Sequence, residues 1–222
     1  MIQIDRLIRT RRKTIALIVE RDGSLVVRAP WHASNRQITQ FVQGKTKWIE
    51  AKQRQIRLAK PESVHKTYVD GELFLYLGEL YALRIVNGSK APLMFNECFL
   101  LRASDVSLAA RLFETWYRER AFEVISARVD VLASQHMFVY HQVKITSART
   151  RWGSCTSHNN LCFTWRLVMA PLPVVDYVVL HELAHLRVKD HSRDFWGLVG
   201  ILMPDYKTHR LWLKNNGFRL DL

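Results

Sequence analysis

Two histidines and a glutamate within five residues have the types and the spacing of a metal site. They lie in the run His181-Glu182-Leu183-Ala184-His185. On a helix, residues four apart lie one above the other on the same face, so both imidazoles can reach a single Zn²⁺ ion. Glu182 then projects beside the open coordination position of the metal. A carboxylate in that place can accept a proton from a zinc-bound water, whose pKa the metal lowers to roughly 7.

A catalytic zinc site also needs a third protein ligand, while water takes the fourth position. His191 is the leading candidate, because it follows His185 after a gap of five residues. Asp190, Asp194 and His209 are the other nearby candidates. The alternative interpretation is a pair of hydrogen-bonded core histidines with a surface glutamate and no metal. It places two imidazoles in a nonpolar setting, which is costly unless each finds a polar partner.

A helix must carry this motif, and the sequence predicts one over residues 174–189. The stretch contains no glycine or proline, and two prolines just before it suit the first turn of a helix. Apolar side chains recur at intervals of three and four, and both histidines fall on this inward side. The residues of this face are Tyr177, Val178, Leu180, His181, Ala184, His185 and Val188. We expect Lys189 and Asp190 to end the helix, with Ser192 capping the next one.

Several further runs in the same half of the chain are distinctive. They are Arg151-Trp152-Gly153-Ser154-Cys155, Trp165-Arg166-Leu167, residues 176–185, His191-Ser192, Phe195-Trp196, Pro204-Asp205-Tyr206 and Trp212-Leu213. Together they resemble the YgjP-like family, whose members are predicted metal-dependent hydrolases related to the WLM and SprT-like zincins. The resemblance is densest over residues 141–213. It implies that His181, His185 and His191 are zinc ligands and that Glu182 is the catalytic base.

A polar segment, residues 149–160, lies between two predicted short strands before the motif helix. In peptide-cleaving zincins, an edge strand beside the metal helix pairs with an extended substrate, and we expect residues 161–166 to take that place. Within the polar segment, Arg149 and Arg151 beside a Gly-Ser turn are candidates for binding phosphate or carboxylate oxygens of a substrate. The alternative is a tight structural turn with Trp152 in the core.

The composition favours a globular protein of one or two domains. With 222 residues, 48% of them hydrophobic, the chain can bury a sizeable core. No stretch approaches the roughly 20 apolar residues of a membrane helix. The basic N-terminus lacks the apolar run of a secretory signal. The three cysteines are odd in number and contain no Cys-x-x-Cys pair. These features predict a cytoplasmic protein with reduced thiols and no membrane partner.

Positive charge is concentrated near the N-terminus. The formal net charge is +13, and residues 1–66 hold 15 Lys and Arg against 5 Asp and Glu. Much of this excess lies on a predicted helix from Asn35 to Lys60, which begins with a capping box of Ser34 and Gln37 and ends at Pro61. Its predicted buried stripe is Ile38, Phe41, Val42, Trp48, Ile49 and Ile56. Such a charge attracts polyanions, so nucleic acid is a candidate partner, and the alternative is a solvated face.

Strand patterns dominate the rest of residues 1–101. The turn dipeptides Asp22-Gly23 and Asp70-Gly71 mark two hairpins, and a long amphipathic helix follows the last strand. The prediction is an α+β fold. An antiparallel β-rich N-terminal region with one basic helix covers residues 1–101, and a zincin-like helical catalytic region that carries the motif helix covers residues 102–222. The two regions are expected to pack as one compact unit.

These observations predict a zinc-dependent hydrolase of the metallopeptidase type, in which Glu182 activates a zinc-bound water. The substrate is a peptide or a nucleotide. One alternative is a metal-dependent nucleoside triphosphate pyrophosphatase or phosphohydrolase that uses the basic residues as a phosphate clamp. Another is a SprT-like protease that associates with DNA through the basic N-terminal region. A purely structural zinc protein is disfavoured, because three ligands plus a base are the arrangement of an open site.

Overall fold

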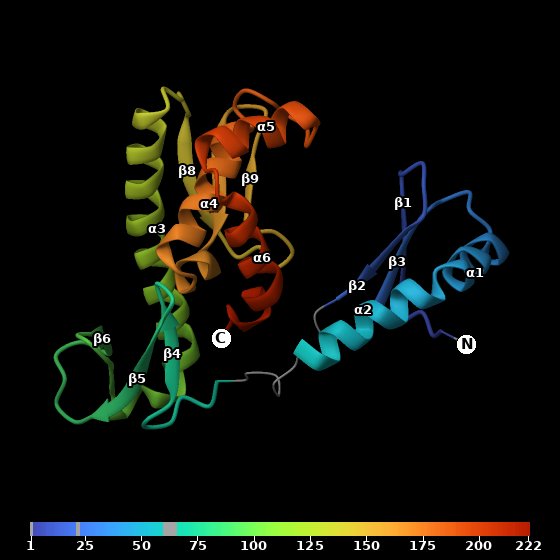
Figure 1. Ribbon diagram of the computed structural model, residues 1–222. Helices are drawn as coiled ribbons and strands as arrows, with labels where there is room; N and C mark the ends of the chain where they lie inside the picture. Colours follow the sequence, from blue (N-terminus) through green and yellow to red (C-terminus); the bar gives the residue numbers. More distant parts are fainter. Residues whose placement is uncertain (1, 21–22, 60–65) are drawn as a thin grey trace. The chain divides into compact units, whose positions relative to one another are not determined.

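The computed structural model describes residues 2–20, 23–59 and 66–222 (Figure 1). The fold is α+β, as predicted, and the chain divides into two compact units, Met1–Ser63 and Val64–Leu222. The division therefore comes earlier in the chain than the boundary predicted after residue 101. Within the described ranges, no helix is both long and apolar enough to cross a membrane.

In the first unit, two helices pack on a three-stranded sheet. The strand order is β1-β3-β2, with β2 antiparallel to β3 but β1 parallel to it, whereas the sequence predicts antiparallel pairs. The elements are β1 (Arg6–Thr10), β2 (Ala16–Val19), β3 (Leu25–Pro30), α1 (Asn35–Gly44) and α2 (Thr46–Ala59). Arg9 joins the sheet to the start of α1, because its guanidinium donates to the carbonyl oxygens of Pro30 and Ala33 and to the Asn35 side chain. Asp22 of the predicted turn lies outside the described residues.

The single helix predicted in this unit is two helices, α1 and α2, which meet at Lys45. The predicted capping box is present, with Ser34 at the N-cap of α1. Gly44 precedes the break, and glycine weakens a helix because it gives up the most backbone freedom on folding. The side chain of Ile56 and the predicted stop at Pro61 lie outside the described part of the chain.

The buried face of these two helices is narrower than the predicted stripe. Ile38, Val42 and Ile49 are buried against the sheet, as predicted. Phe41 and Trp48 are instead 37% and 44% exposed. Each of the two precedes a buried residue by one position, which turns it by about 100° around the helix axis. The aromatic rings therefore lie along the flank of the helical layer.

The second unit begins with four strands that pack on a long helix. The strand order is β4-β5-β7-β6, with β5 and β7 parallel and the outer pairs antiparallel. The elements are β4 (Leu73–Tyr76), β5 (Glu79–Val86), β6 (Leu93–Phe95), β7 (Phe99–Arg102), a 3₁₀ helix (Ala103–Leu108) and α3 (Ala109–Gln135). The Phe113 ring of α3 lies 4.2 Å from that of Phe74 and 4.9 Å from that of Phe99, between ring centroids. Because α3 covers these rings, residues 66–101 belong with the second unit and not with the basic N-terminal region.

A further sheet and three helices complete this unit. They are β8 (Gln142–Thr146), β9 (Gly153–Cys155), β10 (Asn160–Thr164), a 3₁₀ helix (Trp165–Met169), α4 (Leu172–Ala184), α5 (Arg193–Leu202), α6 (Tyr206–Asn216) and a 3₁₀ helix (Gly217–Arg219). The strand order is β8-β10-β9. The edge position predicted for residues 161–166 is therefore wrong, because β8 and β9 pair with both sides of β10. The edge strand that contacts α4 is β9, while α3 packs against β8 (Figure 1).

The last residues of the chain are anchored in the second unit. Arg166 is 4% exposed, and its Nε donates to Oδ1 of Asp221 at 2.6 Å. The side chain of Leu220 is fully buried. Gly217 packs so closely on Trp152 that a Cβ there would lie 2.7 Å from the indole ring. The segment after α6 is thus part of the structure around β9 and β10.

Candidate metal centre

The helix that carries the first two histidines is shorter than predicted. α4 runs from Leu172 to Ala184, so His185 lies just beyond its last residue. The chain then turns at once, because the backbone N–H groups of Arg187 and Val188 both donate to the Ala184 carbonyl oxygen, at 3.1 and 3.0 Å. All residues of this turn are described, and none has a positive φ. The turn therefore forms without a glycine.

This turn brings His191 back to His181 of α4 and to His185, which follows the helix. Nε2 of His191 lies 3.2 Å from Nε2 of His185 and 3.1 Å from Nε2 of His181. The possible ligand atoms of the three residues all lie within 4.8 Å of one another. Three imidazole nitrogens that converge from two sides suit one cation and leave a coordination position open.

The other candidates for the third ligand are held elsewhere. Asp190 accepts a hydrogen bond from the Ser192 backbone N–H at 3.2 Å, and His209 lies 3.0 Å from the Asp205 carboxylate. Asp194 is exposed in the first turn of α5. In the described part of the chain, none of these candidates belongs to the group that can hold a metal ion. His191 is therefore the third candidate ligand in the structure. The hydrogen bonds of Asp190 and His209 could not be read from the spacing of the sequence.

Contacts behind the histidines orient their rings. Nδ1 of His185 lies 3.0 Å from the carbonyl oxygen of Val188, so the proton sits on Nδ1 and Nε2 offers its lone pair. The His185 ring stacks on Phe195 with centroids 4.4 Å apart, and the His181 ring meets Phe195 edge-on at 4.9 Å. Ser192 caps α5 by accepting a hydrogen bond from the Phe195 N–H. The same turn and cap that bring the histidines together therefore also fix their orientation.

Burial favours neutral imidazoles at this cluster. The pKa of His181 is lowered to about 3, first by burial and then by the neighbouring His185, His191 and Arg210. Burial also lowers the pKa of His185. A neutral imidazole is the form that binds a metal ion, so the site suits a cation at neutral pH.

Glu182 is buried beside the cluster, with 4% of its surface exposed. Its carboxylate accepts a hydrogen bond from the backbone N–H of Cys155. Among the described residues, Oε2 has no hydrogen-bond partner. Burial raises the pKa of Glu182 to about 8, while Arg151 and the Cys155 N–H act in the opposite direction. A buried carboxyl with an unsatisfied oxygen fits a site that receives a water molecule.

A glycine makes room for this carboxylate. A Cβ on Gly153 would lie 2.5 Å from Oε1 of Glu182, which is closer than Cβ atoms approach in proteins. The backbones of Trp152 and Thr156 hydrogen-bond to Thr164 and Asn160 of β10. Because hydrogen bonding to the partner strand alternates along an antiparallel ladder, the backbone N–H and C=O groups of Gly153 and Cys155 point the other way, toward the open edge of β9. The sequence predicts only a Gly-Ser turn here, and it misses both the edge strand and the close approach.

A pocket of about 400 Å³ opens on these groups. Its lining residues are Arg151, Trp152, Gly153, Tyr177, Val178, His181, Glu182, His191, Arg210, Leu213 and Lys214. Of the two predicted substrate-binding arginines, Arg151 lines the pocket, whereas Arg149 is exposed and is not among the lining residues. Arg210 and Lys214 were not predicted. Their spacing of four places them on one face of α6, but the sequence does not reveal that this helix packs against α4.

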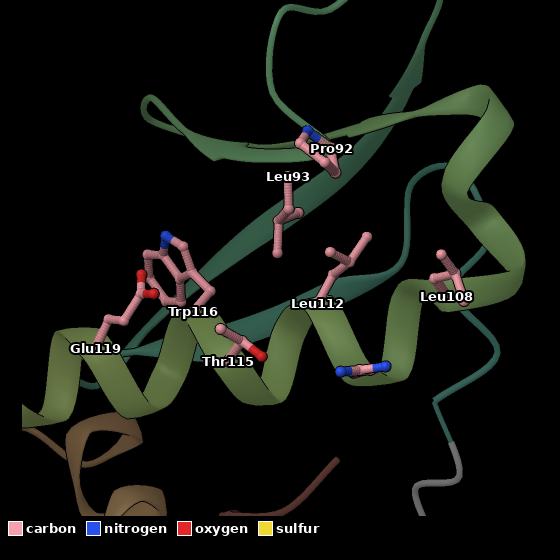
Figure 2. A pocket seen from close by; sticks show the side chains of 8 residues that line it. Pro92, Leu93, Leu108, Leu112, Thr115, Trp116 and Glu119 are labelled. Atoms are coloured by element: carbon pink, nitrogen blue, oxygen red, sulfur yellow. The ribbon is translucent and has the colours of Figure 1, made fainter.

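A second pocket, of about 310 Å³, lies between β6 and the first half of α3 (Figure 2). Figure 2 shows Leu93 pointing toward Leu112 and Trp116 of the helix. The lining is mainly apolar, with Arg111 and Glu119 as its charged residues. None of the lining residues belongs to the histidine cluster, so the chemistry of the chain is concentrated in the first pocket.

Comparison with known proteins gives one match. A family model described as YgjP-like, metallopeptidase domain, matches residues 13–216. A search among curated proteins gives no match, and a search among solved structures gives none either.

Proposed function

Because the chain belongs to the YgjP-like family of metallopeptidase domains, we propose that it is a zinc-dependent hydrolase that cleaves peptide bonds. The observation that carries the proposal is the meeting of three imidazoles beside the buried Glu182, whose Oε2 lacks a partner among the described residues. This arrangement offers three ligands, an open position and a base. Such a set is typical of a catalytic zinc site, because structural sites use four protein ligands.

In this proposal, His181, His185 and His191 hold the metal ion. Imidazole suits Zn²⁺, although other first-row metals accept the same donors. A bound zinc ion supplies a Lewis acid, which lowers the pKa of water to roughly 7 and polarises a carbonyl group. The hydrogen bond from Nδ1 of His185 to the Val188 carbonyl oxygen makes Nε2 more basic and hence a better metal ligand.

Glu182 moves the proton in the proposed reaction. It accepts a proton from the attacking water and returns it to the nitrogen of the leaving group. The Cys155 N–H holds the carboxylate from β9, and the absent side chain of Gly153 leaves space beside it. Burial raises the pKa of Glu182, and a cation held by the histidines would act in the opposite direction, so the carboxylate form that accepts the proton is favoured when the metal is bound.

The open edge of β9 provides a place for an extended peptide. At Gly153 the backbone N–H and C=O groups point away from β10, and an extended chain can add to such an edge through backbone hydrogen bonds. Glu182 contacts this same glycine. A peptide on the edge is therefore presented to the base and to the histidine cluster together.

The test compares zinc-loaded wild-type protein with the Glu182→Gln variant on a mixed peptide library. We expect the variant to lose roughly 10²–10⁴-fold in turnover and to retain its zinc, as measured by metal analysis. Glu119→Gln, which changes an exposed carboxylate on α3, is the matched control and should cleave at the wild-type rate. A zinc-loaded wild-type protein that cleaves no peptide would contradict the proposal.

Hydrolysis of nucleoside triphosphates stays an alternative prediction for the same site. The same proteins can be offered triphosphates with Mg²⁺, because triphosphates usually arrive metal-bound. Turnover of a triphosphate that is lost in Glu182→Gln, without any peptide cleavage, favours this alternative over the peptidase.

We further propose that the first unit binds nucleic acid. The supporting observation is that Phe41 of α1, Lys45 at the junction of the two helices and Trp48 of α2 are all exposed. Aromatic rings next to a cation can stack on unpaired bases while the cation meets the phosphates. Binding of a single-stranded oligonucleotide should weaken steeply as the salt concentration rises, because counterion release drives the association. Binding that is absent or insensitive to salt contradicts the proposal.

A further inference from the structure

The metal-site pocket is lined by three cationic side chains and one acidic one. Arg210 and Lys214 come from one face of α6, and Arg151 comes from the segment before β9. The acidic residue, Glu182, is buried and hydrogen-bonded to β9. The cations therefore approach the pocket from two different elements.

Packing holds the two cationic sides in place. The Arg210 guanidinium lies 4.5 Å from the centre of the Trp196 ring, and Trp196 in turn stacks near His191, with centroids 5.8 Å apart. On the other side, the contact of Trp152 with Gly217 ties the segment that carries Arg151 to the residue after α6. The Arg210 guanidinium is thus held next to the histidine cluster, and the backbone that carries Arg151 is fixed beside the end of α6.

Arg151 interacts electrostatically with the buried Glu182, but the pocket holds more cations than carboxylates. In the described part of the chain, none of Arg151, Arg210 and Lys214 forms an ion pair with a carboxylate. Elsewhere in the same unit, Arg128 pairs with Asp176 and Arg166 pairs with Asp221, each at 2.6 Å. Three cations against one carboxylate around a concave site create a positive potential that favours an anion.

We propose that Arg151, Arg210 and Lys214 form a subsite for a carboxylate of the substrate, next to the bond that is cleaved. This inference rests on the proposed peptidase function, because a carboxylate is the anion that a peptide carries. Its source is either an acidic side chain or the C-terminal carboxylate of the peptide. Guanidinium groups suit a carboxylate because they can donate two parallel hydrogen bonds.

The first experiment measures binding, so it does not depend on turnover. Zinc-loaded Glu182→Gln protein is titrated with peptides that differ only in charge, and binding is followed by calorimetry. One pair compares Asp or Glu with Asn or Gln at each position, and the other compares a C-terminal acid with its amide. We expect the charged member of one pair to bind about 10- to 100-fold more tightly, the range of a hydrogen bond to a charged group. The pair that shows the difference identifies the source of the carboxylate.

Variants then assign the preference to the cations. Arg210→Met combined with Lys214→Met removes the two charges that α6 contributes to the pocket but keeps an apolar side chain over Trp196 at position 210. Lys207→Met is the matched control, because Lys207 is exposed on the same helix and does not line the pocket. Loss of the preference in the double variant, with zinc content and circular dichroism unchanged and with the control behaving like wild type, supports the subsite.

Three outcomes would overturn the subsite. Equal binding of charged and neutral peptides is one, and a preference that survives both the double variant and Arg151→Met is another. The third is tighter binding of a nucleoside triphosphate through the same cations, which would assign them to phosphate. Failure of the proposed peptidase function can be told apart from failure of the subsite. In that case the wild-type protein cleaves neither charged nor neutral peptides, whereas the binding experiment still shows whether the subsite exists.

Discussion

The two units of the molecule place their polar side chains in opposite ways. In the described part of the chain, the buried polar residues Thr164, Arg166, Glu182 and His185 all lie in the second unit. The first unit buries apolar residues such as Leu25 and Val27, and its described Lys and Arg residues are exposed or half-buried. Polar burial is costly unless partners compensate it, so the second unit keeps these groups at a cost to its stability.

This difference separates two kinds of functional evidence. In the second unit, function depends on a few atoms at short distances, such as the three Nε2 atoms, and a change of one residue should abolish it. In the first unit, the proposed binding of nucleic acid would depend on a field summed over many exposed charges, and a change of one residue should weaken it only partly. The two units should therefore respond differently to the same kinds of change.

Metal removal should have the largest effect and should act on one unit alone. Treatment with a chelator should reduce peptide hydrolysis to background, and added Zn²⁺ should restore it. His191→Ala should remain inactive after zinc is added, because it removes one of three ligands. Oligonucleotide binding, measured by fluorescence anisotropy, should be unchanged in both cases. Hydrolysis that persists when metal analysis finds no bound metal contradicts the assignment.

Gly153→Ala should damage the site without removing a functional group. Its Cβ would lie 2.5 Å from Oε1 of Glu182, so the carboxylate must move. We expect peptide turnover to fall about 10²-fold, as for a misplacement of roughly 1 Å, and the free energy of unfolding to fall by about 1–3 kcal/mol. Kinetics and thermal denaturation measure the two effects.

Gly197→Ala is the control for this substitution. Gly197 lies in α5, and a Cβ at this position meets nothing within 4 Å. It should leave turnover unchanged and stabilise the helix by about 1 kcal/mol. Equal effects of the two substitutions would show that the contact with Glu182 is irrelevant.

Trp48→Ala should weaken oligonucleotide binding by the first unit without affecting hydrolysis. Loss of one stacked base costs about 1–3 kcal/mol of binding free energy, and because Trp48 is 44% exposed the fold should not depend on it. Anisotropy titrations with single-stranded and double-stranded oligonucleotides measure this loss. If the variant binds both oligonucleotides as tightly as the wild-type protein, the Trp48 ring does not contact nucleic acid.

Lys45→Ala should have the smallest effect. If Lys45 meets one phosphate, the slope of log affinity against log salt should become shallower by about 0.7 for single-stranded nucleic acid. Lys90→Ala, at an exposed position of the second unit, is the control and should leave the slope unchanged. Equal slopes for the two variants would show that Lys45 meets no phosphate.

The reach of sequence reasoning follows the range of the interactions involved. The spacing of His181, Glu182 and His185 on α4 and the capping box at Ser34 depend on neighbours within one helical turn, and pattern rules describe such neighbours well. The family was also recognisable from runs of adjacent residues. Local periodicity was less reliable for Trp48, because an aromatic residue at the side of an apolar stripe can be buried or exposed.

Long-range arrangements could not be predicted in the same way. The edge position of β9, the contact of Gly153 with Glu182 and the approach of Arg210 all depend on which elements pack together. The order of the chain alone predicts that the strands of residues 66–101 belong to the N-terminal region, because they precede the long helix. Their aromatic side chains instead pack on that helix, which only the tertiary structure reveals.

The ion pair between Arg166 and Asp221 bears on the order in which the protein matures during synthesis. Chains emerge from the ribosome N-terminus first, and domains generally fold as units. A chain made only as far as residue 216 already contains the three histidines and Glu182, yet Arg166 still lacks its counter-charge and the buried Leu220 is missing. A buried cation without its partner is strongly destabilising. The second unit therefore reaches its stable form only after residues 217–222 have left the ribosome, by which time the whole first unit has already emerged.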